Sequence, residues 1–138
     1  MTTCDDGMPN TEERIHRVLV VDDDPSIRQV MNDLLTLAGY TVATANDAET
    51  ALTIIEKNAF EMLITDLGLP QMDGWDLAVA ARRFQPNLGI LAISSWQGTD
   101  AATRMVEHGI DLVVWKPFRF DQIKEAIGRM NGLLAARP

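Results

Sequence analysis

The segment Val18-Leu19-Val20-Val21-Asp22-Asp23-Asp24-Pro25 decides the fold, because four β-prone apolar residues run directly into three carboxylates. An unbroken apolar run that stops at polar residues is typical of a strand buried in a parallel sheet. Pro25 suits the first turn of a helix, and Asp24 suits the N-cap before it. The segment therefore predicts acids where a buried strand ends and a helix begins, at the sheet edge where open α/β folds bind ligands.

The three adjacent carboxylates need compensation, because like charges placed together repel and resist ionisation. Two later segments end in charged residues that suit this purpose, one strand in Asp66 and another in Lys116. One interpretation is a divalent-cation site built from strand ends. The other is a solvated turn with a helix cap, which the acid run alone slightly favours.

The rest of the chain alternates strand-like and helix-like segments. Strands are expected at 18–21, 40–44, 60–66, 88–93 and 112–115. Helices are expected at about 25–38, after the N-cap Asp47, and at about 75–84, 99–107 and 118–134. Apolar spacing predicts these inward-facing helical residues: Ile27, Val30, Met31, Leu34, Leu35 and Leu37; Ala51, Leu52, Ile54 and Ile55; Leu77, Ala80, Ala81 and Phe84; Ile123, Ala126, Ile127, Met130 and Leu133.

Five strands alternating with five helices predict an α/β domain with a parallel sheet covered on both faces. Right-handed crossovers leave few topologies, and one of them is the strand order 2-1-3-4-5. In that order Asp22, Asp23 and Asp66 meet in one crevice, while Ser94 and Lys116 end the next strands outward.

Composition restricts the class of protein. The chain has 138 residues, which suits one domain, and we expect a tail at 1–14 followed by a folded domain at 15–136. The net charge of −8 argues against nucleic-acid binding by this domain. The sequence has no apolar run near the ~20 residues of a membrane helix, no signal-peptide pattern, and one cysteine, Cys4. A cytoplasmic protein is expected.

The residues at the predicted crevice suit phosphoryl chemistry. Oxygen-rich acid clusters favour Mg²⁺, and an aspartate can act as a nucleophile that forms an acyl phosphate. A cation and the Lys116 ammonium would neutralise charge on phosphoryl oxygens, and the Ser94 hydroxyl could donate a hydrogen bond to one.

Four motifs in order resemble the receiver domain of two-component response regulators. They are the acid motif at 20–25, the phosphoacceptor loop Asp66-Leu67-Gly68-Leu69-Pro70-Gln71-Met72-Asp73-Gly74, Ser94 at the family's Thr/Ser position, and Lys116-Pro117-Phe118. The resemblance covers about 17–134. It implies a flavodoxin-like doubly wound sheet of order 2-1-3-4-5 and a cis peptide before Pro117.

The resemblance also implies the role of each site residue. Asp66 would accept a phosphoryl group from the phosphohistidine of a histidine kinase or phosphotransfer protein. Mg²⁺ would be bound by Asp23 and Asp66, by Asp22 mainly through water, and by the backbone carbonyl of Gly68. Lys116 and Ser94 would contact the phosphoryl group. The chain would be a signalling switch, without enzymatic activity beyond its own phosphorylation and dephosphorylation.

The sequence departs from the family pattern at the switch. Val113 stands where family members usually carry Tyr or Phe, so we hypothesise that Trp115 provides an aromatic surface on the face of the fourth helix, fifth strand and fifth helix, where an output partner would bind. The alternative is that Trp115 fills the core. Gly68 and Trp96 occupy positions that tune acyl-phosphate lifetime in the family, and Trp75 is either a partner contact or a packing residue.

Other functions stay open at this point. Asp22-Asp23-Asp24 contains the Asp-x-Asp of haloacid-dehalogenase-type phosphatases, although Pro25 and the match around Asp66 argue against that class. A flavin-binding protein would need a phosphate loop that the first strand lacks. A receiver-like module that binds without phosphorylation is motivated by Val113. His16 and His108 are interpreted as a solvated strand entry and a helix C-terminal residue. Both a stand-alone receiver and a fragment of a longer regulator fit the sequence, as does a homodimer.

Overall fold

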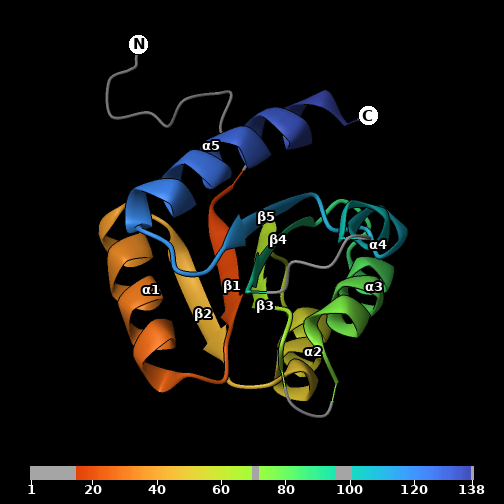
Figure 1. Ribbon diagram of the computed structural model, residues 1–138, viewed down its shortest axis with the longest axis horizontal. Helices are drawn as coiled ribbons and strands as arrows, with labels where there is room; N and C mark the ends of the chain where they lie inside the picture. Colours follow the sequence, from red (N-terminus) through yellow and green to blue (C-terminus); the bar gives the residue numbers. More distant parts are fainter. Residues whose placement is uncertain (1–14, 70–71, 96–100, 138) are drawn as a thin grey trace.

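The computed structural model describes residues 15–69, 72–95 and 101–137. In these parts of the chain, strands and helices alternate from β1 to α5 (Figure 1). The strands are β1 (Arg17–Val21), β2 (Thr41–Ala45), β3 (Met62–Asp66), β4 (Gly89–Ser94) and β5 (Leu112–Trp115). The helices are α1 (Pro25–Leu37), α2 (Ala48–Lys57), α3 (Gly74–Phe84), α4 (Ala101–Glu107) and α5 (Phe120–Ala136).

The strands form one parallel sheet in the order β2-β1-β3-β4-β5, which confirms the predicted topology. The registers pair Val21 with Thr65 and Asp66 with Ile93, so β1, β3 and β4 end at nearly the same level. The residues that follow these strands therefore share one edge of the sheet. This is the edge at which the sequence predicts the site.

Each face of the sheet has its own apolar core, because successive strand residues point to opposite sides. Val18 and Val20 of β1 belong to a cluster with α1 and α5, whereas Leu19 and Val21 belong to a cluster with α2 and α3. Figure 1 shows the same division, with α1 and α5 separated from α2, α3 and α4 by the strands. Among the described helices, none is long and apolar enough to cross a membrane.

Aspartates are the N-cap residues of three helices, α1, α2 and α3. Asp24 caps α1 by accepting a hydrogen bond from the Ser26 N–H at 2.8 Å. Asp47 caps α2 through the Thr50 N–H, and Asp73 caps α3 through the Asp76 N–H. The hydrogen bond from the Thr50 N–H also holds the pKa of Asp47 below its ordinary value. Gly39 has φ of +101° after α1, the left-handed conformation that favours glycine at this position.

Several helical residues predicted to face inward are exposed, and those predictions are wrong. They are Val30, Leu37, Phe84 and Leu133. Each lies at the margin of an apolar stripe whose centre is buried, as at Met31 and Leu35 of α1. The neighbouring elements cover less of each helix than the spacing suggested. The expected tail at 1–14, the residue Trp96 and the start of the fourth helix at 99 lie outside the described residues.

Candidate functional site

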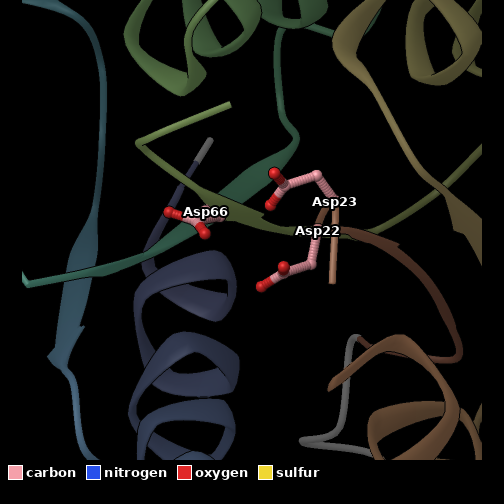
Figure 2. Close-up of side chains that lie close together, drawn as sticks. All are labelled: Asp22, Asp23 and Asp66. Carbon is pink, nitrogen blue, oxygen red and sulfur yellow. The ribbon is translucent and has the colours of Figure 1, made fainter. Parts of the chain in front are cut away.

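Three carboxylates meet where β1 and β3 end. Asp22 and Asp23 directly follow β1, Asp66 is the last residue of β3, and one oxygen of each lies within 4.8 Å of the others. Figure 2 shows Asp22 and Asp23 extending toward the side on which Asp66 lies. The structure thus brings together the acids that the sequence places at separate strand ends. Asp24 has a different role, because its side chain caps α1.

Lys116, directly after β5, supplies positive charge to this acid cluster. Its Nζ lies 2.8 Å from Asp66 Oδ2 and 3.9 Å from Asp22 Oδ2. Partial burial works to lower the pKa of Lys116, but the hydrogen bond to Asp66 and the charges of the acids outweigh it and raise the pKa. The ammonium is therefore charged at neutral pH. The peptide bond between Lys116 and Pro117 is cis, as the family resemblance implied.

Asp22 is the most enclosed of the three acids, with 2% of its surface exposed. Its Oδ1 accepts a hydrogen bond from the Asp24 N–H at 2.9 Å, while its Oδ2 has no hydrogen-bond partner among the described residues. Burial, followed by the charge of Asp66, raises the pKa of Asp22 above its ordinary value. Within the described parts of the chain, this buried carboxylate oxygen therefore has no hydrogen-bond donor, and its nearest positive charge is the Lys116 ammonium at 3.9 Å.

Backbone contacts fix the position of Asp66. Its Oδ1 accepts a hydrogen bond from the Gly68 N–H at 2.8 Å, so its two oxygens have different partners, Gly68 and Lys116. Gly74 passes so close to the end of β3 that a Cβ there would lie 2.7 Å from Leu67 Cα and 3.0 Å from the Asp66 carbonyl carbon. This glycine is required because the backbone of the loop folds directly against the acid's own backbone.

A cleft of about 480 Å³ opens beside Asp66. Its lining includes the buried Ser94 at the end of β4, Gly68, Trp75 and the half-buried Arg104 of α4. The serine hydroxyl and the acid thus face one cavity, as the strand ends predicted. The cavity is large enough for a phosphoryl group and ordered water.

The sequence did not single out Arg104 as a site residue. It lies ten residues after Ser94 on a short helix of weak apolar pattern, and no motif marks which side of that helix faces the cleft. Trp75 is 6% exposed, so it is a packing residue and not an exposed partner contact. Trp115 is 39% exposed on β5, which contradicts the alternative that it fills the core. His16 is exposed, as expected.

The donor set fits a hard divalent cation. Three carboxylates offer oxygen ligands within 4.8 Å of one another, and the Oδ2 of Asp22 has no hydrogen-bond donor among the described residues, with only the Lys116 ammonium at 3.9 Å. Oxygen ligands of this kind suit Mg²⁺, which usually keeps several waters and binds one or two carboxylates. The residues present are therefore compatible with a magnesium site at the carboxyl edge of the sheet.

A doubly wound sheet of this order, with an acid cluster and a strand-end lysine at its carboxyl edge, defines the class of receiver-like α/β proteins. The family model for the response regulator receiver domain matches residues 18–128. The chain belongs to the family of response regulator receiver domains.

Relatives and solved structures agree with this assignment. The chain is 30% identical over 126 residues to the sensor histidine kinase RcsC of Escherichia coli, covering 88% of this chain and 13% of RcsC. It is 30% identical over 113 residues to the response regulator protein FleR of Pseudomonas aeruginosa, covering 82% and 24%. The chain thus spans a quarter or less of these curated relatives.

Two solved structures show the likeness in three dimensions. The chemotaxis response regulator CheY4 of Vibrio cholerae superposes with a TM-score of 0.80 at 29% identity, covering 85% of this chain and 99% of that one. The non-phosphorylated HemR receiver domain of Leptospira biflexa gives 0.80 at 28% identity, covering 89% and 98%. Receiver domains are signalling domains and are generally not classed as enzymes.

Proposed function

We propose that the chain is a phosphorylation-controlled switch of a two-component phosphorelay, with Asp66 as the phosphoacceptor in a Mg²⁺-dependent reaction. One observation carries this proposal: the Asp66 carboxylate is held by Gly68 and Lys116 beside two further acids, at the mouth of a cleft. A carboxylate that is fixed on both oxygens and borders a cleft is arranged to act as a nucleophile.

The transfer step follows from these groups. A carboxylate oxygen of Asp66 attacks the phosphorus of a partner's phosphohistidine, a P–O bond forms, and the P–N bond breaks with its electron pair returning to the imidazole nitrogen. Lys116 holds Asp66 beforehand and then a phosphoryl oxygen, and the Ser94 hydroxyl donates to another. Water later attacks the same phosphorus and releases inorganic phosphate, which restores the carboxylate.

We assign the cation ligands to Asp23 and Asp66 directly, to Asp22 through water, and to the backbone carbonyl of Gly68. The proximity of the three carboxylates and the unpartnered Asp22 oxygen support this assignment. Bound Mg²⁺ supplies positive charge that neutralises the phosphoryl oxygens during transfer. Asp22 and Asp23 would otherwise repel the incoming phosphoryl group, so their role in the reaction is to bind the cation.

We propose a histidine kinase or histidine phosphotransfer protein as the phosphoryl donor, in the cytoplasm, and 15–136 as the receiver unit. The output partner, whether a separate protein or a fused domain, would bind the face formed by α4, β5 and α5. The exposure of Trp115 at 39% and Val106 at 79% supports this location, because exposed apolar side chains favour protein contacts.

The test is incubation with acetyl phosphate and Mg²⁺ followed by intact mass measurement. We expect an added mass of about 80 Da, one phosphoryl group, which EDTA abolishes. Asp66→Asn should stay unmodified, whereas Asp33→Asn, an exposed acid of α1, should be labelled like the parent protein. An unmodified parent protein, or equal labelling of Asp66→Asn, would contradict the proposal.

A second candidate is a receiver that works by binding alone, and Val113 favours it because the usual switch aromatic is absent. The same mass measurement separates the two, since a binding module would give no added mass. A phosphatase of the haloacid-dehalogenase type would instead turn over a phosphomonoester, and Asp22→Asn would abolish that turnover while Asp66→Asn would not.

A further inference from the structure

Arg104, Trp75 and His108 form a stack between α3 and the end of α4, beside the proposed phosphoacceptor. The Arg104 guanidinium carbon lies 4.6 Å from the centroid of the buried Trp75 ring, a cation–π contact. The His108 ring meets the same indole edge-on at a centroid distance of 5.2 Å. Both contacts join the end of α4 to Trp75 in the first turn of α3. His108 Nδ1 also lies 2.8 Å from the Arg104 carbonyl oxygen, which holds the imidazole against α4.

The same guanidinium faces the cleft that holds the phosphoacceptor. Arg104, Trp75, Ser94 and Asp66 all line the cavity of about 480 Å³. Asp66 is paired with Lys116 at 2.8 Å, and the Arg104 guanidinium lies over the Trp75 ring at the wall of the same cleft. Because both residues line the same cleft, a movement of the Arg104 side chain off the ring and into the cleft would bring its guanidinium toward Asp66.

We propose that Arg104 is a second cationic contact for a phosphoryl group on Asp66, and that it leaves Trp75 to make this contact. This inference rests on the proposed function and identifies a residue whose contacts would change when Asp66 is phosphorylated. A phosphoryl group adds about two negative charges to an edge that already holds three carboxylates. Guanidinium binds phosphate oxygens in a bidentate, charge-assisted geometry, which is stronger than a partly exposed cation–π contact.

The consequence is a signal that does not need an aromatic residue at position 113. When Arg104 leaves the indole, the contact between α3 and α4 loses its cation–π component, and the packing of α4 against α3 changes. The position of α4 thereby depends on the charge at Asp66. Val113 cannot provide the ring movement that most family members use, so this chain would transmit the change through the Trp75 stack.

The test uses beryllium trifluoride with Mg²⁺ as a non-covalent phosphoryl mimic, titrated into the full chain. Arg104→Gln should weaken its binding by about tenfold, the loss of one charge-assisted contact. Arg104→Lys should recover part of the affinity, because it keeps the charge without the bidentate fork. Arg129→Gln, an exposed α5 residue, makes the same charge change away from the cleft and should bind like the parent protein.

A second measurement follows the Trp75 emission in a background carrying Trp96→Phe and Trp115→Phe. Saturating mimic should shift the spectrum when Arg104 is present and leave it unchanged in Arg104→Gln. If the parent protein is labelled by acetyl phosphate but Arg104→Gln binds the mimic with parental affinity, the inference is wrong and the proposed function stands. If the parent protein is neither labelled nor bound by the mimic, both are wrong.

Discussion

Replacing Asp22 by asparagine should make the metal-free protein more stable. The side chain is 2% exposed and its Oδ2 has no hydrogen-bond partner among the described residues. Asparagine has nearly the same shape, and its amide oxygen can still accept the hydrogen bond that the Asp24 N–H donates at 2.9 Å. The substitution therefore removes a buried negative charge with little change in packing.

The magnitude follows from the charges around Asp22. With an effective dielectric constant of about 20, the ammonium of Lys116 at 3.9 Å attracts Asp22 by about 4 kcal/mol. Asp23 and Asp66, each with an oxygen within 4.8 Å, repel it by about 3 kcal/mol apiece or more. Repulsion exceeds attraction, and burial adds to the cost. Allowing for solvent screening of the exposed Asp23, the variant should gain about 2 kcal/mol, or about 5 °C in Tm.

The assay is urea unfolding in EDTA, with Glu125→Gln as a control that removes one exposed charge on α5. Burial and the charge of Asp66 raise the pKa of Asp22, so the folded state binds its proton more tightly than the unfolded state does. The advantage of Asp22→Asn should shrink as the pH falls through that raised pKa. Added Mg²⁺ should stabilise the parent protein more than the variant. A variant less stable than its parent in EDTA would refute the electrostatic reasoning.

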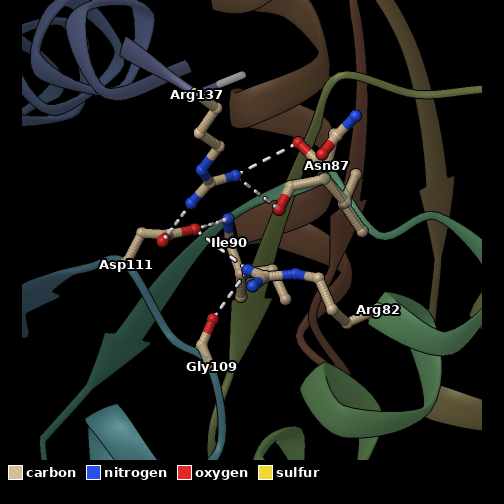
Figure 3. A network of polar contacts seen from close by, with 7 residues as sticks. Arg82, Asn87, Ile90, Gly109, Asp111 and Arg137 are labelled. Atoms are coloured by element: carbon tan, nitrogen blue, oxygen red, sulfur yellow. Dashed lines mark hydrogen bonds and ion pairs between the residues drawn. The ribbon is translucent and has the colours of Figure 1, made fainter.

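Three further predictions concern Lys116, Asp111 and Gly74. Lys116→Met should lower the free energy of unfolding at neutral pH, measured by urea unfolding at a series of pH values. Burial opposes protonation of Lys116, but pairing with Asp66 raises its pKa, so the stability difference between parent and variant should persist at neutral pH and disappear only above about 10.5, the ordinary pKa of lysine. Asp111→Ala should cost about 3 kcal/mol of unfolding free energy in urea, because Arg82, Arg137 and the Ile90 N–H lose their shared acceptor (Figure 3). Gly74→Ala should cost on the order of 3 kcal/mol and reduce acetyl phosphate labelling, since its Cβ would lie 2.7 Å from Leu67 Cα beside the Asp66 backbone.

The topology and the acid cluster could be predicted because both depend on where strands end. Each of Asp22, Asp66 and Lys116 follows a short apolar run, and parallel strands bring such ends to one edge. The helical stripes were predicted too broadly. At Leu37 and Phe84 the 3.6-residue period continues past the last residue that a neighbour covers, so spacing locates the centre of a stripe and not its width.

The contacts of Asp111 and Arg104 could not be predicted, because their partners are distant in sequence and carry no pattern. Asp111 precedes β5 and binds Arg82 of α3 at 3.1 Å and Arg137 after α5 at 2.5 Å, across separations of 29 and 26 residues. Burial lowers the pKa of Arg82, although the charge of Asp111 opposes this change. Ion pairs of this kind depend on which helices come together in the folded protein, and only the three-dimensional arrangement determines that.

The unmodified site and the proposed phosphorylated site differ in the amount of negative charge that must be neutralised. The cations of the site therefore have different roles in the two states. Before modification, three carboxylates face one ammonium, so a divalent cation relieves repulsion that the fold otherwise bears. In the proposed phosphorylated state, the added phosphoryl charge would exceed what Lys116 alone neutralises. A further cation at the cleft wall is then favoured in the modified state alone. Arg104 is placed for this role because it lines the same cleft as Asp66, and its guanidinium packs on the Trp75 ring at the cleft wall.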